Sequence, residues 1–173
     1  LFLSHIWSTG QDANATIKRQ LCLLLPGVSI FLDVDDLEVN VPTRHLSHEP
    51  PSHAMCVRLQ DIGALEAYIG ASQLVQLFCS GGYFKSRNCL REVRATLEQG
   101  KDVTLMADPD KGGAPLEVIK NEECPEELRG PVFDDRGVVL WHRLHDFQFV
   151  SLKQLAEQLL LGTICAGKRG MIA

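Results

Sequence analysis

Short runs of apolar residues alternate along this chain with segments of helical periodicity, and this alternation limits the possible folds more than any other feature. The apolar runs cover residues 1–5, 28–32, 74–79, 103–107 and 138–141, and each is too short for a core helix. The helical patterns cover residues 13–25, 64–71, 88–99 and 151–161. Strands that alternate with helices predict a parallel sheet covered on both faces.

The predicted fold is therefore α/β: a three-layer, flavodoxin-like arrangement of five parallel strands in the order 2-1-3-4-5, with helices on both faces. In open sheets of this kind, ligands bind at the carboxyl ends of the strands, where the strand order reverses. That point lies between the first and third strands. The loops after residues 5 and 79 are thus the expected walls of a binding site.

Serines mark the expected starts of two helices. Ser86 and Ser151 are predicted N-caps, because a serine hydroxyl can accept a hydrogen bond from a free backbone N–H of the first helical turn. Residues 8–12 are expected to form a polar turn, since they precede the first apolar-periodic residues. Residues 108–135, which are rich in proline, glycine and acids, are expected to form a loop with short helical turns.

The composition fits one globular domain in a reducing compartment. The net charge is −5 and no basic cluster occurs, which argues against binding of nucleic acid and against contact with anionic membranes. The six cysteines form no C-x-x-C pair, and Cys22 and Cys79 lie in apolar runs, as buried thiols do.

No apolar run of the sequence approaches the ~20 residues that a membrane span requires. We expect a cytoplasmic domain at residues 1–161 with a tail at 162–173, both part of a longer protein.

Three motifs follow one another along the chain. They are F-L-S-H at residues 2–5, V-S-I-F-L-D-V-D-D-L-E at residues 28–38, and Y-F-K-S-R-N-C-L-R-E at residues 83–92. Their order and spacing resemble the TIR domain (Toll/interleukin-1 receptor/resistance protein), in particular the TIR domains of plant resistance proteins and of the animal axon-degeneration NAD hydrolase. The first motif is similar to the first TIR box, the second to the strand and BB loop, and the third to the plant motif S-x-W-C-L-x-E.

The resemblance implies an enzyme that cleaves the nicotinamide–ribose bond of NAD, with NAD as substrate and with no cofactor or metal. Glu92 matches the catalytic glutamate of such enzymes, since a carboxylate beside the ribose stabilises the positive charge that develops as nicotinamide leaves. The other expected contacts to NAD are His5, Trp7, Asp33, Leu37 and Asn88. Asn88 replaces the tryptophan of plant domains, so Trp7 is the candidate for the missing aromatic face. Without the motif, Glu92 would be an ordinary solvated glutamate near Arg94.

Other TIR domains are the partners that the resemblance implies. Such domains self-associate through the loop that here contains Asp33, Asp36 and Glu38, so a homo-oligomer is expected. A second function stays open, that of a non-catalytic adaptor that only recruits other TIR domains, and Glu92 with its surroundings separates the two. A third hypothesis is a receiver-like or nucleotide-binding domain. It is weaker because the residue pattern of receivers is missing and neither G-x-G-x-x-G nor a Walker motif occurs.

Residues 39–60 do not fit this frame, and their removal leaves an ordinary acidic loop that enters a helix. They hold three of the 6 histidines and three of the 8 prolines and show no periodicity, so we expect a disordered insert. The segment begins with valine and ends with glutamine, whose codons suit the GT and AG ends of an in-frame intron, and a retained intron is one hypothesis. The alternative is zinc binding by His45, His48, His53 and Cys56, whose spacing suits a metal site.

Overall fold

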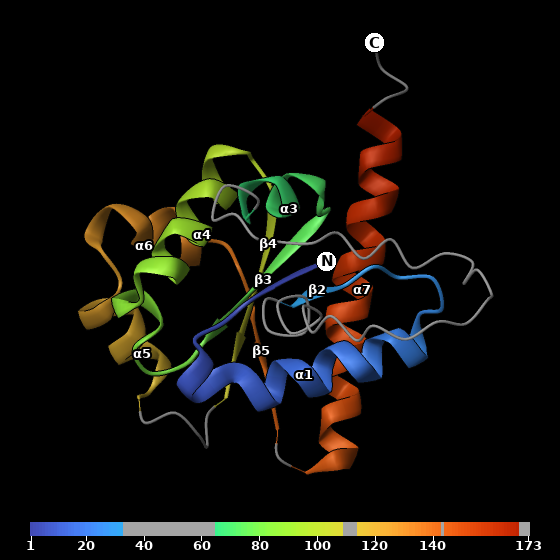
Figure 1. Ribbon diagram of the computed structural model, residues 1–173, viewed down its shortest axis with the longest axis horizontal. Helices are drawn as coiled ribbons and strands as arrows, with labels where there is room; N and C mark the ends of the chain where they lie inside the picture. The colour runs from blue at the N-terminus through green and yellow to red at the C-terminus, as the bar shows by residue number, and fades with distance from the viewer. Residues whose placement is uncertain (33–64, 109–113, 143, 170–173) are drawn as a thin grey trace, which may run out of the picture.

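The computed structural model describes residues 1–32, 65–108, 114–142 and 144–169, in which strands alternate with helices (Figure 1). The strands are β1 (Phe2–Ser4), β2 (Phe31–Leu32), β3 (Leu74–Cys79), β4 (Asp102–Ala107) and β5 (Val138–Leu140). The helices are α1 (Trp7–Leu24), α3 (Leu65–Ala71), α4 (Arg87–Glu98), α5 (Leu116–Val118), α6 (Glu126–Phe133) and α7 (His145–Arg169). A 3-10 turn, η2 (Tyr83–Lys85), and a π-helical turn, η3 (Ile119–Glu123), complete the described elements.

The five strands form one sheet in the order β2-β1-β3-β4-β5, and every strand pair is parallel. Phe2 of β1 lies opposite Phe31 of β2 on one side and opposite Val75 of β3 on the other. The strand order therefore reverses between β1 and β3. This topology confirms the predicted flavodoxin-like α/β fold.

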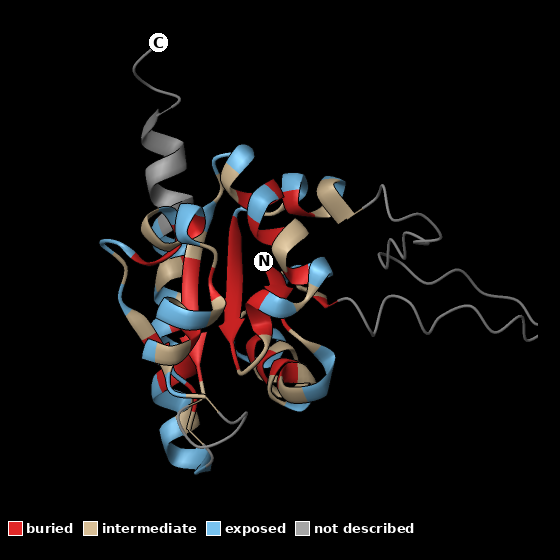
Figure 2. Ribbon diagram, turned by 90° about the vertical axis from the view of Figure 1, so that its left-hand side faces the viewer, coloured by how far each residue is buried: buried red, intermediate tan, exposed pale blue. Residues whose placement is uncertain are grey.

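Two hydrophobic cores lie on opposite faces of the sheet (Figure 2). Side chains of β3 alternate between them, because successive residues of a strand point to opposite faces. Val75 and Leu77 pack in the core beneath α4 and α6, whereas Leu74 and Phe78 pack in the core beneath α1 and α7. Every residue of β3 is buried. This explains its largely apolar sequence, in which Gln76 is the polar residue, since strands covered on both faces are predominantly apolar.

Helix α1 begins at Trp7, so the polar turn predicted at residues 8–12 is wrong. The reason is a packing contact of Gly10, which is buried in the first turns of the helix. A Cβ atom at Gly10 would lie 3.0 Å from Cβ of His5 and 3.2 Å from Cδ1 of Phe78. The absence of a side chain lets α1 approach the sheet, and this tertiary contact outweighs the low helix propensity of glycine.

The four described cysteines, Cys22, Cys79, Cys89 and Cys124, are free thiols. Cys79 is buried on β3 as predicted, and burial raises the pKa of its thiol to about 12. The prediction for Cys22 is wrong, because this residue is exposed on α1. Its neighbour Leu21 takes the inward-facing position of that helical turn and is fully buried.

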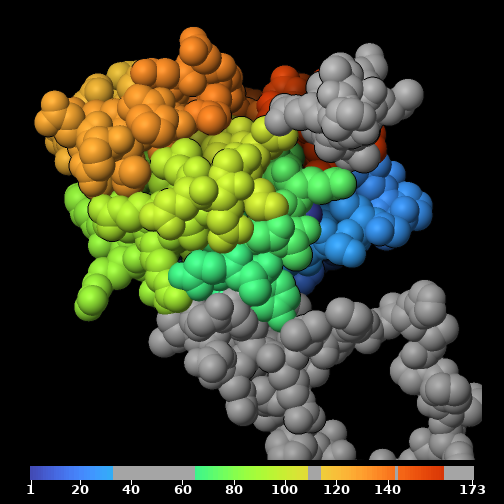
Figure 3. Space-filling model, turned by 90° about the horizontal axis from the view of Figure 1, so that it is seen from above, coloured from blue at the N-terminus to red at the C-terminus, as the bar shows by residue number. Residues whose placement is uncertain are grey.

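Helix α3 lies against α4 (Figure 3) and is held there by polar contacts. Nε of Arg91 on α4 is 2.5 Å from Oε1 of Glu66 on α3, and this hydrogen bond lowers the pKa of the Glu66 carboxyl. Lys101 donates a hydrogen bond to the carbonyl oxygen of Gly70 near the end of α3. The chain is thus anchored on α4 where it re-enters the described structure, directly after residues 33–64.

Helix α7 begins at His145, before the start predicted at Ser151. Ser151 lies inside the helix and is no N-cap: its hydroxyl donates a hydrogen bond to the carbonyl oxygen of Leu140, at the end of β5. Asp146 favours the earlier start, since a negative charge stabilises the first turn of a helix. The helix continues to Arg169, so residues 162–169, predicted as part of a tail, extend it.

The predicted loop at residues 108–135 contains α5, η3 and α6 in its described part, so it holds more helix than the short turns expected. Ile119, Leu128 and Val132 bury their side chains in the core beneath α4, which explains why this segment is ordered despite its prolines. The insert at residues 39–60, with its intron and zinc hypotheses, lies outside the described residues. Among the described helices, none combines the length and the apolar content that a membrane span requires.

Candidate functional site

The carboxyl ends of β1 and β3 lie side by side where the strand order reverses (Figure 1). Ser4 ends β1, and Ser80 directly follows β3. The hydroxyl of Thr9, in the first turn of α1, lies 2.7 Å from the hydroxyl of Ser80. The thiol of Cys89 on α4 donates to the carbonyl oxygen of His5 at 3.4 Å. These contacts join the two loops that were predicted to form the ligand site.

Glu92 lies on the inward-facing side of α4. Ser86 caps this helix as predicted, since its hydroxyl accepts a hydrogen bond from the N–H of Cys89 at 3.4 Å. Cys89, Glu92, Val93 and Thr96 follow the i, i+3, i+4, i+7 spacing of one helical face, and all four are buried. Glu92 is only 5% exposed, so it is not the solvated surface glutamate of the alternative interpretation.

The hydroxyl of Ser4 contacts the carboxylate of Glu92, and the phenol of Tyr83 contacts that hydroxyl in turn. The hydroxyl of Ser4 donates a hydrogen bond to Oε2 of Glu92, and Oγ of Ser4 also forms a hydrogen bond with the phenol of Tyr83. All three residues are buried. Because burial of a charge costs several kcal/mol unless polar partners replace water, these contacts supply part of the environment that a carboxylate at this depth requires.

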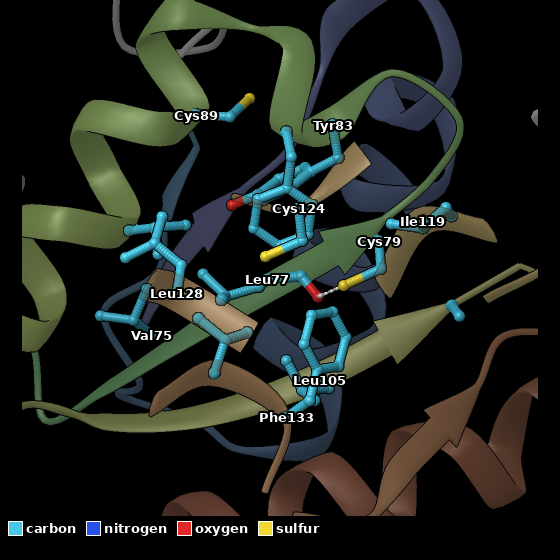
Figure 4. Packing of buried hydrophobic residues seen from close by; sticks show 14 of the residues in the cluster. Val75, Leu77, Cys79, Tyr83, Cys89, Leu105, Ile119, Cys124, Leu128 and Phe133 are labelled. Carbon is cyan, nitrogen blue, oxygen red and sulfur yellow. Dashed lines mark hydrogen bonds between the residues drawn. The ribbon is translucent and has the colours of Figure 1, made fainter. Parts of the chain in front are cut away.

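Tyr83 is enclosed by hydrophobic side chains (Figure 4), and its ring packs edge-on against Phe84 with the centroids 5.0 Å apart. Burial raises the pKa of Tyr83 well above its ordinary value of 10.0, and Cys89 and Glu92 raise it further, whereas the hydrogen bond with Ser4 acts in the opposite direction. The phenol of Tyr83 therefore keeps its proton at neutral pH and is available as a hydrogen-bond donor.

A tight turn brings Tyr83 to this position. Gly82 has a φ of 86°, in the left-handed region that glycine enters without steric cost. Glu123 of η3 fixes the turn: its carboxylate accepts a hydrogen bond from the N–H of Gly82 at 2.8 Å and pairs with Lys85 at 3.0 Å. This turn sets the start of η2.

The other predicted NAD contacts differ in their surroundings. His5 is buried, with Nε2 2.6 Å from Oε1 of Gln11 and Nδ1 3.3 Å from the carbonyl oxygen of Leu3, so both ring nitrogens have partners within the protein. Trp7 is 56% exposed at the start of α1, directly after β1. Asn88 is exposed in the first turn of α4. The exposed indole of Trp7 thus offers an aromatic face just after the end of β1.

The remaining predicted contacts, Asp33 and Leu37, lie outside the described residues. The same is true of Asp36, Glu38 and the histidines of the insert. Within the described part of the chain, no three His, Cys, Asp or Glu side chains come together as a metal site would require.

The hydrogen bonds that connect Tyr83 to Ser4 and Ser4 to Glu92 were missed at the level of sequence, where Ser4 and Tyr83 appeared only as parts of motifs. One signal was present: Glu92 falls on the apolar stripe of its helix, between Cys89 and Val93. An acid on such a stripe needs polar partners. Which residues serve as these partners depends on the strand order, because Ser4 of β1 comes close to the segment after β3 only in the folded sheet.

Comparison with known proteins identifies the fold. No family model matches the chain, and no curated protein matches it. Among solved structures, the chain is similar to the TIR domains in the structure of the activated Roq1 resistosome directly recognizing the pathogen effector XopQ. The TM-score is 0.50 at 16% sequence identity, over 91% of this chain and 96% of that chain. The chain has the TIR fold. In this fold, the motifs that contain Ser4 and Glu92 are far apart in sequence but meet at the carboxyl end of β1.

Proposed function

We propose that this TIR-fold domain is an NAD hydrolase with Glu92 as its catalytic residue. The proposal rests on one observation: a buried carboxylate, bonded to the Ser4 hydroxyl, lies at the strand ends where open α/β sheets bind ligands. A hydrophobic pair would hold α4 against β1 without the cost of burying a charge. The presence of an acid at this point therefore favours a functional role over a purely structural one.

The chemistry of NAD cleavage suits such a carboxylate. The nicotinamide of NAD is a cationic leaving group that departs as a neutral molecule, so the reaction needs no strong general acid. The ribose becomes oxocarbenium-like as the bond breaks, and a nearby negative charge stabilises that state more than it stabilises the substrate. Water then adds to the ribose carbon and releases a proton, which gives nicotinamide and ADP-ribose.

Two features directly after β1, the strand that ends at Ser4, suit the remainder of NAD. The indole of Trp7 is exposed and can stack on nicotinamide or adenine. Helix α1 begins after Ile6 without a side-chain cap, and the N–H groups of a first helical turn favour a pyrophosphate. His5, Asp33, Leu37 and Asn88 stay predicted contacts. Of these, Asn88 on α4 is the exposed polar residue within the described structure that could reach the ligand.

The test compares two glutamates on the same helix. The purified chain is incubated with NAD, and nicotinamide release is followed by chromatography. Glu92→Gln removes the charge while preserving the shape, so we expect release to fall at least about a hundredfold. Glu98→Gln is the matched control, because Glu98 is exposed at the end of α4, and it should retain wild-type release. Undiminished release by Glu92→Gln would contradict the assignment.

Each form is also assayed without residues 39–60, because these follow the loop that TIR enzymes use in assembly. Faster release from the shortened chain would indicate that the insert limits access or assembly. Transcript sequencing tests the intron hypothesis, which fails if every mature message carries the segment.

A second candidate is the non-catalytic adaptor, in which association with other TIR domains in the cytoplasm is the whole function. Exposed apolar side chains at the start of α7 favour association: Leu144, Phe147, Phe149 and Val150 are each at least 44% exposed. Exposed apolar side chains concentrated in one short segment favour an interaction surface there. The proposed occupant is a second copy of this chain.

Analytical ultracentrifugation measures this association. Phe147→Ser combined with Val150→Ser should lower it, whereas Leu23→Ser, at an exposed apolar position on α1, is the control. Association that responds to the α7 change, with no nicotinamide released by any form, would favour the adaptor. Release that depends on Glu92 would favour the enzyme.

A further inference from the structure

We propose that Ser4 and Tyr83 are positioning residues that form a one-way chain of hydrogen bonds, Tyr83 to Ser4 to Glu92, which orients the Glu92 carboxylate and stabilises its charged form. The kinetic part of this inference rests on the proposed NAD hydrolase function. The contacts themselves do not, because they are formed within the folded chain.

The direction of the chain follows from proton counting. A charged carboxylate only accepts hydrogen bonds, so the hydroxyl proton of Ser4 points to Oε2 of Glu92. A serine hydroxyl has one proton, and Oγ of Ser4 is therefore the acceptor in its contact with Tyr83. Tyr83 must then be the donor. Successive hydrogen bonds that point the same way polarise and strengthen one another.

The Tyr83 phenol suits the first place in this chain. The phenol is enclosed in the core and keeps its proton, since burial raises the pKa of Tyr83 well above its ordinary value. An ionised phenol would turn the Ser4 proton away from Glu92. A Tyr83 phenol that keeps its proton at neutral pH leaves Ser4 with one arrangement, in which the Ser4 proton faces the charged carboxylate.

The three residues come from three separately fixed elements. Ser4 is held in β1 by its register with Leu77 of β3. Tyr83 begins η2, whose turn is fixed by Glu123 through the N–H of Gly82. Glu92 lies on α4, which Ser86 caps. The donors are therefore set before a substrate binds, and such preorganisation is what an electrostatic catalyst needs.

The consequence is specific for turnover. Loss of either hydroxyl leaves Glu92 in place but less precisely oriented, so kcat should fall between about tenfold and a hundredfold. KM should change little, because the substrate contacts remain. The charged form of the carboxylate also loses support, so the acid limb of the pH profile of kcat should move to higher pH.

Three variants and one control test this. Tyr83→Phe removes only the phenol oxygen and keeps the ring packing, so it is usable even if Ser4→Ala fails to fold. Ser4→Thr retains the hydroxyl and should recover much of the activity that Ser4→Ala loses. The control is Thr96→Val, since the Thr96 hydroxyl donates to the backbone carbonyl of Glu92 at 2.7 Å and not to its carboxylate. Thr96→Val should leave the acid limb where it is in the wild type.

A second measurement separates this proposal from the proposed function. Carbon-detected NMR follows the titration of the Glu92 carboxyl in the wild type, in Tyr83→Phe and in Ser4→Ala. We expect the midpoint to rise in both variants. If it rises but the wild type releases no nicotinamide, the hydrogen-bond chain is correct and the hydrolase function is wrong. If the midpoint does not move in either variant, the chain is overturned, even where Glu92→Gln abolishes release.

Discussion

Ser4, at the end of β1, donates a hydrogen bond to Glu92 on α4 across 88 positions of the sequence. The contact joins the first strand to the helix that follows the third strand. It therefore links the chemistry of the candidate site to the stability of the fold, and both can be measured on the same variants.

The free energy of this contact should appear in a double-mutant cycle of Ser4→Ala and Glu92→Ala. A hydrogen bond to a charged group contributes about 1.5–3 kcal/mol, so a coupling energy of that size is expected from urea unfolding. The cycle of Ser4→Ala with Glu98→Ala should give a coupling within about 0.5 kcal/mol of zero, because Glu98 is exposed at the far end of α4. Equal coupling in both cycles would contradict the assigned contact.

Gly10→Ala should destabilise the domain by about 1–3 kcal/mol, as overpacking of a core does. The new methyl group would meet Cβ of His5 at 3.0 Å and Cδ1 of Phe78 at 3.2 Å, and neither atom is the end of a flexible side chain. Gly137→Ala is the matched control, since no atom lies within 4 Å of the added Cβ. Thermal or urea denaturation of the two variants gives the comparison, and a stable Gly10→Ala protein would show that α1 can move away from the sheet.

Thr104→Val and Thr96→Val should have opposite effects on the free energy of unfolding. In the described structure the buried hydroxyl of Thr104 has no hydrogen-bond partner, nor does Oε1 of Gln76, which lies in register beside it on β3. Valine has the same shape, so Thr104→Val should be neutral or stabilising by up to about 1 kcal/mol. Thr96→Val removes a hydrogen bond to Glu92 and should cost about 1 kcal/mol. A clear loss of stability in Thr104→Val would reveal a partner for its hydroxyl.

Thiol labelling at pH 8 should distinguish the cysteines of the native protein. Burial raises the pKa of Cys79 to about 12 and that of Cys124 to about 11, and only the thiolate reacts. Exposed Cys22 should therefore be alkylated first, as read by peptide mass spectrometry, and urea should make all three reactive. Fast native labelling of Cys79 would mean that β3 opens locally.

The same pKa of Cys79 predicts the direction of a pH effect on stability. The unfolded thiol ionises near its ordinary value of 9.0, whereas the native thiol stays protonated up to about 12. Ionisation then favours the unfolded state, so the free energy of unfolding should fall as the pH rises through this window. Cys79→Ala should lose less stability over that range than the wild type does.

The strands were predictable because a strand that is covered on both faces of a parallel sheet has a largely apolar sequence. The predicted bounds of β3 match the observed bounds, and the predicted order of the five strands is confirmed. Two of the predicted helix starts were wrong, those of α1 and α7. Both depend on contacts that sequence periodicity does not encode: the close approach of Gly10 to His5, and the hydrogen bond from Ser151 to Leu140.

The candidate site was predictable only in part, because its residues come together through the fold. Glu92 and Trp7 could be named from motif and position, and Glu92 could be suspected of burial from its place between Cys89 and Val93. The hydrogen-bond partners could not be named from sequence. Ser4 reaches Glu92 through the pairing of β1 with β3, and Tyr83 reaches Ser4 through the turn at Gly82. His5 stays a predicted NAD contact, and its ring nitrogens lie beside Oε1 of Gln11 and the carbonyl oxygen of Leu3.

The interior position of β1 has a consequence for how such a chain is made. β1 precedes the other four strands in the chain, yet it lies between β2 and β3, and its register with Val75 cannot form until that residue has left the ribosome. The hydrogen bond from Ser4 to Glu92 forms later still, after α4 has left the ribosome. During synthesis the apolar β1 strand is therefore exposed without either of its neighbours, which is when a chaperone would have the most reason to bind it.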